Sequence, residues 1–333
     1  MFKKLSTTLF AVILMLSVFI IPIFTQSTES AVVADSVKDI QENKLEESII
    51  ESIMRKKPAL SFSFSYYEDS DSVELAYYQQ GADFNIKDII YSISYGRGYF
   101  REPVFDSIYE DRYSIGTKFD KKDFSIKSFY ILREFSNGVD SHNYKIEYKG
   151  QIFLLKDIKL KHSYENVGTR KAIHSKIKYH SYFFQTEQKL PLNFYINPKY
   201  EFKDYNDNNN LHAGVLGIFY GLLEEHPIKA GYELHFKDAK NNATEYYTPQ
   251  EVVIHMAKVK FSGNLFNSEF HYTSSFGIGH ASEKDAADKN VNSADFYIEY
   301  SPNDCWDIYL YYDFFKDPTY DGQTIEGVVR FKF

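Results

Sequence analysis

The sequence predicts an all-β protein, an antiparallel transmembrane β-barrel of about 16 strands preceded by a short N-terminal helix. Three observations support this prediction. Apolar and polar residues alternate with a period of two over most of the chain after residue 58. Aromatic residues make up 18% of the 333 residues, with 29 Tyr and 29 Phe against one Trp. Short turns alternate with longer polar loops, as they do in barrels that cross a membrane.

Residues 1–31 have the pattern of an export signal peptide. Lys3 and Lys4 form a basic start, and a largely apolar run over residues 9–23 follows. This run is shorter than the roughly 20 residues that a spanning helix needs, and small residues return near Ala31 and Ala34, where cleavage is expected. An uncleaved anchor helix is the alternative. A signal peptide implies that the mature protein leaves the cytoplasm.

Residues 35–57 are the one good helix candidate. Val37, Ile40 and Leu45 begin an apolar series at helical spacing among Glu and Lys residues, and Pro58 ends it. Because this segment precedes the first strand, we expect a short helix in the periplasm.

Residues 59–333 are expected to form the barrel. Leu60, Phe62 and Phe64 alternate with serines, and the chain closes in the same style with Phe331 and Phe333. This apolar-out, polar-in repeat is typical of strands that face lipid. A soluble sandwich also alternates, but it buries its apolar face against a second sheet and needs fewer aromatic residues.

The connections provide an independent test of this topology. Short turns are expected at or near residues 87–88, 120–123, 156–157, 188–191, 226–227, 263–264 and 302–303. Longer polar loops are expected at residues 68–72, 99–112, 135–142, 165–171, 204–210, 238–250, 282–292 and 316–323. Together they join about 16 strands, and an even number returns the chain to its starting side. Both termini are therefore expected in the periplasm.

Several kinds of partner and site are disfavoured. Cys305 is the only cysteine, so no intramolecular disulfide can form, and a formal charge of -8 argues against nucleic acid. The acidic loop at residues 204–210 lacks the glycine and the final acid of a calcium loop. His174 and His180 are separated by two lysines, which repel a metal cation. We therefore expect no metal and no cofactor.

No catalytic residue is expected either. No serine has the flanking residues of a nucleophile elbow, and there is no pair of closely spaced cysteines. The protein is therefore predicted not to be an enzyme. A lipid-modifying barrel enzyme is the third alternative, with a Ser and a His brought together from separate strands.

The charged residues of the inner face are the candidate functional residues. If the aromatic face points outward, a basic wall lines the pore, with Glu147 as its main acid. It consists of Lys127, Arg133, Lys145, Lys149, Lys159, Lys161, Lys176 and Lys178. An acidic wall is expected opposite, formed by Glu269, Asp295, Glu299, Asp307, Asp313 and Glu326. Two such walls would orient a polar solute in an aqueous passage. Alternatively, these charges pair among themselves or with a plug.

Three stretches resemble the C-terminal porin domain of exopolysaccharide export proteins, the outer-membrane subunits that export cellulose and poly-N-acetylglucosamine. The first is Lys57-Pro58, which leads into the strand at residues 61–67 and then into Asp69-Ser70-Asp71. The second is Tyr95-Gly96-Arg97-Gly98, resuming at Tyr113-Ser114-Ile115-Gly116. The third is a segment that opens a strand in those barrels, here Tyr246, Tyr247, Thr248, Pro249 and Gln250.

The resemblance implies an outer-membrane porin that exports a saccharide polymer. It also implies that the insertion machinery of the outer membrane reads Phe333. Those porins carry long tetratricopeptide arrays before the barrel, whereas one short helix is expected here, so a separate periplasmic scaffold protein is an expected partner, beside membrane lipid and a polysaccharide or other polar solute. The alternatives are a general diffusion porin and a surface-display barrel.

Overall fold

The computed structural model describes residues 58–333 except 70–72, 87–88, 103–106, 153–154, 168, 224–227, 244–245, 247, 266–268, 285–287, 304 and 317–320. The expected signal peptide and the expected helix at residues 35–57 lie outside the described residues. Within the described part of the chain, no helix is long and apolar enough to cross a membrane.

The described residues form one antiparallel sheet of 17 strands. They are β1 (Ala59–Asp69), β2 (Glu74–Ile86), β3 (Ile89–Arg101), β4 (Ile108–Asp120), β5 (Phe124–Phe135), β6 (Asp140–Ile152), β7 (Leu155–Asn166), β8 (Lys178–Gln185), β9 (Gln188–Lys189), β10 (Phe194–Tyr205), β11 (Asn210–Leu223), β12 (Ile228–Ala239), β13 (Val252–Leu265), β14 (Phe270–Ser282), β15 (Lys289–Asn303), β16 (Trp306–Lys316) and β17 (Asp321–Lys332). Two short helices, α3 (Arg170–His174) and η1 (Pro191–Asn193), lie between strands.

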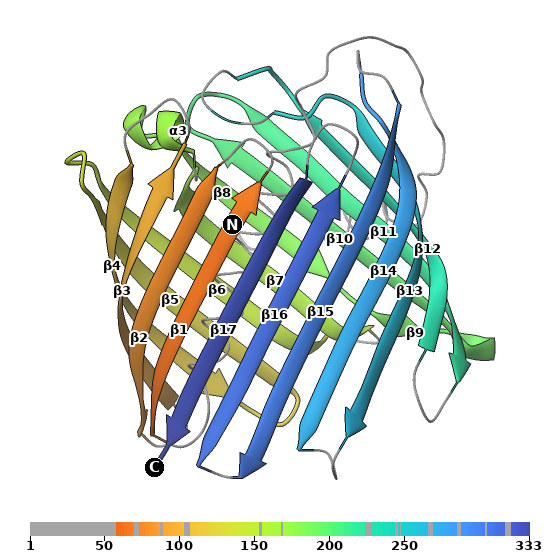
Figure 1. Ribbon diagram of the computed structural model, residues 1–333, viewed down its shortest axis with the longest axis horizontal. Coiled ribbons are helices and arrows are strands. Elements are labelled where there is room, and N and C mark those ends of the chain that lie inside the picture. Colours follow the sequence, from red (N-terminus) through yellow and green to blue (C-terminus); the bar gives the residue numbers. More distant parts are fainter. Residues whose placement is uncertain are drawn as a thin grey trace, which may run out of the picture.

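The sheet closes on itself into a barrel. The first strand, β1, pairs with β2 on one side and with β17 on the other, from Ala59 opposite Lys332 to Asp69 opposite Gly322. Figure 1 shows β1 in orange beside β17 in dark blue. The two-residue β9 only extends the hairpin between β8 and β10, so 16 strands form the wall, as predicted. Closure leaves none of these strands as an open edge.

The connections alternate as the sequence predicts. The connection that carries α3 lies at the end of the barrel opposite Phe333 (Figure 1), and we call these the long-loop end and the short-turn end. Three turns were predicted a few residues off. Residues 156–157 already belong to β7, with Asp157 at a φ of 50°. Residues 263–264 belong to β13, which runs to Leu265, and residues 302–303 belong to β15, which runs to Asn303. Polar residues and glycine are tolerated near strand ends, so they mark the region of a turn better than its position.

The two faces of the wall differ in burial. In β1, Leu60, Phe62 and Phe64 are 42%, 52% and 43% exposed, whereas the alternating serines are buried inside the barrel. A water-soluble protein buries its apolar side chains, and this chain does the opposite around the barrel. An apolar outer face around a polar interior is the arrangement of a barrel that stands in lipid, and it excludes the soluble sandwich.

Candidate functional site

Most of the predicted basic wall lies on the inner face of the barrel. Lys127 and Arg133 of β5, Lys145 of β6 and Lys161 of β7 are buried inside it. Lys149 and Lys159 share that face and are more exposed, and they stand directly opposite each other on β6 and β7. The structure therefore brings these six side chains to one side of the lumen.

Two residues of the basic wall do not line the lumen. Lys176 is exposed in the turn between α3 and β8, with a φ of 56°. Lys178 lies on the outer face, because it alternates with the buried Tyr179 and its Nζ lies 5.4 Å from the centre of the Tyr164 ring. The prediction was wrong here because both faces of β8 carry aromatic residues, so aromatic content does not distinguish the outward face of that strand.

The predicted acidic residues are mostly on the inner face, with one exception. Their strands place five of them there: Asp295, Glu299, Asp307, Asp313 and Glu326. Glu269 instead lies exposed in the turn before β14, because β13 runs on to Leu265 and β14 begins only at Phe270, later than expected. It does not belong to the inner wall.

The acidic residues contact cations on neighbouring strands. Lys332 Nζ lies 2.6 Å from Asp307 Oδ1, and Lys258 Nζ lies 3.5 Å from Asp295 Oδ2. Arg330 donates to the buried Asp83 of β2. The acidic wall is thus neutralised locally, at least in part, which agrees with the alternative that these charges pair among themselves.

Basic residues on β10 to β13 also line the lumen, although they were not among the residues predicted to do so. The alternation of β12 places Lys229 and Lys237 on its inner face, and the register with β13 places Lys258 and Lys260 beside them. Together with Lys199 and Lys161 they line a cavity of about 640 Å³ inside the barrel. The signal was present, because Lys229 to Lys237 alternate regularly with apolar residues in the sequence.

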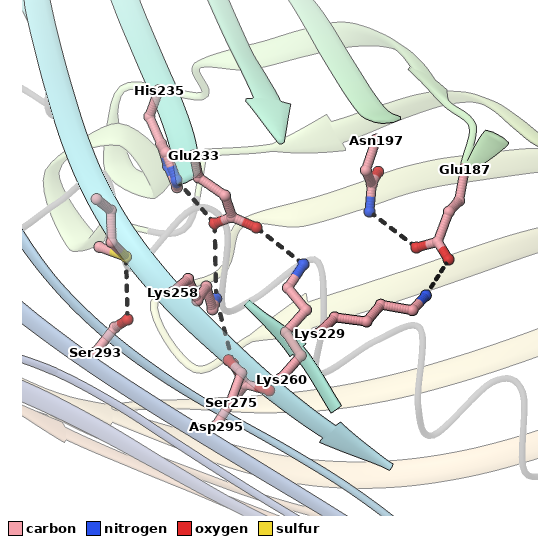
Figure 2. Close-up of polar contacts among 11 residues, drawn as sticks. Glu187, Asn197, Lys229, Glu233, His235, Lys258, Lys260, Ser275, Ser293 and Asp295 are labelled. Atoms are coloured by element: carbon pink, nitrogen blue, oxygen red, sulfur yellow. Dashed lines mark hydrogen bonds and ion pairs between the residues drawn. The ribbon is translucent and has the colours of Figure 1, made fainter. Parts of the chain in front are cut away.

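Glu233 is the centre of the charged network in this cavity (Figure 2). Its carboxylate lies 3.0 Å from Lys260 Nζ, 3.7 Å from Lys258 Nζ and 3.1 Å from His235 Nε2. The carboxylate itself is buried, while the lysines are partly open to the cavity. One carboxylate therefore holds a group of bases at the wall of the lumen.

A second network lies beside it, also drawn in Figure 2. Glu187, in the connection between β8 and β10, accepts from Lys229 Nζ at 2.7 Å and from the Asn197 side-chain amide at 3.4 Å. The same Nζ stands 3.8 Å from the centre of the Tyr195 ring. The lysine is thus held between a carboxylate and an aromatic face, an arrangement that stabilises a cation.

A third carboxylate that contacts lysine is that of Glu147 on β6. Three ammonium groups surround its buried carboxylate, from Lys127 at 3.8 Å, Lys149 at 3.6 Å and Lys159 at 3.5 Å. Three bases thus share the carboxylate of Glu147, whereas Asp295 adds a second carboxylate beside Lys258 in the Glu233 network. Along the inner face of the strands from β5 to β13, lysines outnumber carboxylates.

A tighter cluster stands on β4 and β5. The fully buried Glu110 accepts from Arg112 Nε at 2.8 Å and from Arg133 Nε and Nη2 at 2.8 and 2.9 Å. The Arg112 guanidinium also covers the Tyr77 ring at 4.4 Å. Gly98 makes room for that ring, since a Cβ there would stand 2.8 Å from Tyr77 Cδ2. This glycine belongs to the second stretch on which the family resemblance rests.

The connection between β7 and β8 folds into the mouth at the long-loop end. Thr169 caps α3 by accepting from the amide of Ala172 at 3.2 Å, and Ala172 and Ile173 are completely buried. Ile173 packs on inner-face residues at the ends of β3 to β5 and on the following loop, namely Phe100, Ile108, Phe135 and Val139. This apolar contact fastens α3 across part of the mouth.

The third stretch on which the family resemblance rests, residues 246–250, also lies at the long-loop end. Tyr246 is buried in the loop before β13, where its ring stacks on Tyr205 at 4.7 Å and its hydroxyl donates to Asp207. Pro249 is also buried, and Gln250 donates to the carbonyl of Ala239 at 3.0 Å. Tyr247 lies outside the described residues. The segment precedes β13 and packs inside the mouth.

No family model and no curated protein sequence matches this chain. Among solved structures it is similar to a "Bacterial polysaccharide outer membrane secretin", with a TM-score of 0.65 and 14% identity over 84% of this chain and 99% of that chain. CdiB from Acinetobacter baumannii has a TM-score of 0.49 at 7% identity, over 84% of this chain and 60% of that one. OccAB3 from Acinetobacter baumannii has a TM-score of 0.41 at 9% identity, over 83% and 99%. The first likeness shows the fold, that of a bacterial outer-membrane β-barrel.

Proposed function

We propose that this protein is an outer-membrane porin that passes a polar solute through its lumen, in particular a saccharide polymer. The observation that carries the proposal is the charged cavity inside a closed barrel. Side chains fill the interior of the narrowest barrels, whereas wider ones leave a passage. The likeness to the barrel described as a polysaccharide secretin, which extends over nearly all of that chain, favours a polymer as the solute.

A general diffusion porin is the second candidate, and α3 is the observation that favours it. An inward-folded loop that narrows the passage suits a channel that sorts small solutes by size. A lipid-modifying enzyme is disfavoured because three of the described histidines on the outer face contact tyrosine hydroxyls rather than serine hydroxyls. The hydroxyl oxygen of Tyr200 lies 2.7 Å from Nδ1 of His212. The hydroxyl of Tyr232 contacts His255 in the same way, and that of Tyr130 contacts His142.

The two transport functions differ in how a long sugar chain affects the current through a single barrel in a planar bilayer. For a polymer pathway, we expect linear dextrans to interrupt the current for times that grow with chain length. For a diffusion porin, long chains would stay outside and leave the current unchanged, while short sugars would enter the lumen and lower it. A barrel that conducts neither salt nor sugar would contradict both.

The α3 contact offers a matched pair of variants for this experiment. Ile173→Asp puts a charge into the apolar cluster, so α3 should loosen and the open-state current should rise severalfold because a buried, unpaired charge is costly. Lys171→Asp changes an exposed residue of the same helix and should leave the current as it was. Equal currents in both variants would show that α3 does not obstruct the passage.

We also propose that the long-loop end faces outward and that both termini are periplasmic, with Phe333 available to the insertion machinery. An even number of strands supports this orientation. An epitope tag inserted at Asn208, in the loop between β10 and β11, should then be labelled on intact cells. A tag at Lys122, in the turn between β4 and β5, should be labelled only after the outer membrane is opened. The reverse pattern would invert the orientation.

A further inference from the structure

We propose that the solute is an anionic saccharide chain, whose carboxylate or phosphate groups bind the lysines of the cavity that β7 to β16 line. This inference rests on the proposed function and names its substrate class. Six lysines line the cavity, namely Lys161, Lys199, Lys229, Lys237, Lys258 and Lys260. The carboxylates that line it are those of Glu201, Glu233 and Asp295. The lining therefore carries more positive than negative charge.

In the networks around Glu233 and Glu147, several bases share one carboxylate, instead of each base having a carboxylate of its own. Glu233 meets Lys258, Lys260 and His235, and Glu147 meets three lysines at 3.5–3.8 Å. Glu147 alone faces three lysines, whereas the Glu233 network holds a second carboxylate, since Asp295 lies 3.5 Å from Lys258 Nζ. Over the whole cavity lining, six lysines stand against three carboxylates, which leaves a positive remainder. The lumen walls have a low dielectric constant and focus this remainder into the cavity, which attracts anions.

The register of the strands places like charges directly opposite each other. Lys149 faces Lys159 across β6 and β7, and Lys229 faces Lys260 across β12 and β13. Such like-charged cross-strand pairs destabilise a sheet. Carboxylates of the wall offset part of this repulsion, because Glu147 lies close to both Lys149 and Lys159. Likewise, Lys229 contacts Glu187, and Lys260 contacts Glu233. An anionic group of the solute would offset more of it, whereas a neutral or cationic solute would not.

Lysine, rather than arginine, suits a saccharide chain that has to move through the lumen. All the strong bases among the cavity-lining residues are lysines. A lysine is a flexible point charge, whereas arginine holds a carboxylate or phosphate in a fixed two-point geometry. Transport needs binding that favours entry and is weak enough, over several sites, to allow exit. The cavity meets this requirement with several lysines, of which Lys199, Lys229, Lys258 and Lys260 are partly exposed.

The test measures how saccharides of matched length block the current through single barrels in planar bilayers. Oligogalacturonate supplies carboxylates, phosphorylated maltodextrin supplies phosphates, maltodextrin is neutral and chitosan oligomers are cationic. We expect an anionic chain to block at about tenfold lower concentration than the neutral one, the lower end of what a charged cleft gives. The preferred anionic chain distinguishes carboxylate from phosphate. The preference should shrink as salt is raised.

Variants assign the preference to the cavity. Lys229→Gln, Lys258→Gln and Lys260→Gln together should abolish it, whereas Lys121→Gln, Lys122→Gln and Lys156→Gln, which remove the same charge from exposed positions, should preserve it. If the first set does not fold, Glu233→Gln combined with Lys258→Gln and Lys260→Gln removes the acid with its bases and should still weaken the preference.

Two kinds of failure can be told apart. If neutral and anionic chains block equally, or the cationic chain blocks best, the inference is overturned while the polymer pathway stands. If the barrel conducts salt but no saccharide changes its current, the proposed function itself is wrong.

Discussion

Glu110→Gln is expected to destabilise the barrel by about 3–5 kcal/mol, because the change removes the charge of a buried carboxylate that holds the partly buried Arg112 and the buried Arg133. Glu110 binds Arg112 and Arg133 through three hydrogen bonds of 2.8–2.9 Å, and its side chain is 1% exposed. Glutamine keeps the shape of the side chain and removes only the charge. The free energy of unfolding by urea in lipid vesicles measures the effect.

Glu251→Gln is the matched control for this change. Glu251 also pairs with a base, Lys284 at 3.0 Å, but the two side chains are 47% and 39% exposed. Surface ion pairs contribute about 0–1 kcal/mol, so little should change. If the two variants lose similar stability, the cluster around Glu110 is well hydrated and does not hold β4 and β5 together as its burial indicates.

Ile278→Lys is expected to cost about 2–4 kcal/mol, because the new ammonium group would stand in the hydrocarbon of the membrane. Ile278 is 68% exposed on the outer face of β14, next to the similarly exposed Phe276. Leu234→Lys on the outer face of β12 should have an effect in the same direction. Folding into vesicles, followed by unfolding in urea, gives the size of the loss.

Thr273→Lys is the control on the same strand. Thr273 lines the cavity on the inner face, so its replacement would meet water and charged neighbours and should fold nearly as the unchanged protein does. Glu233 would be a poor control, because a lysine there would face His235, Lys258 and Lys260 without a carboxylate. Equal losses at Ile278 and Thr273 would contradict the assignment of the two faces.

The sequence by itself determined the fold of this protein. The alternation of apolar and polar residues can be recognised in a single strand without knowing its partner, and turn residues mark the region where each strand ends. These local signals gave a barrel of 16 strands, and they placed Lys127, Arg133, Lys145 and Lys161 on the inner face. They were sufficient because a barrel wall is one residue thick, so the face of each residue follows from its position in its own strand.

The tertiary structure decided what local periodicity cannot express. Which face of β8 points inward depended on its pairing with β7, because aromatic residues occupy both faces, and this moved Lys178 to the outside. The folding of α3 into the mouth depended on apolar contacts with strands far away in the sequence. The positive excess of the lumen depended on which bases share a carboxylate, and that sharing joins β5, β6 and β7 at Glu147 and joins β12 to β13 at Glu233. Contacts between strands and loops set these features, and a strand's own sequence does not record the side chains it will meet.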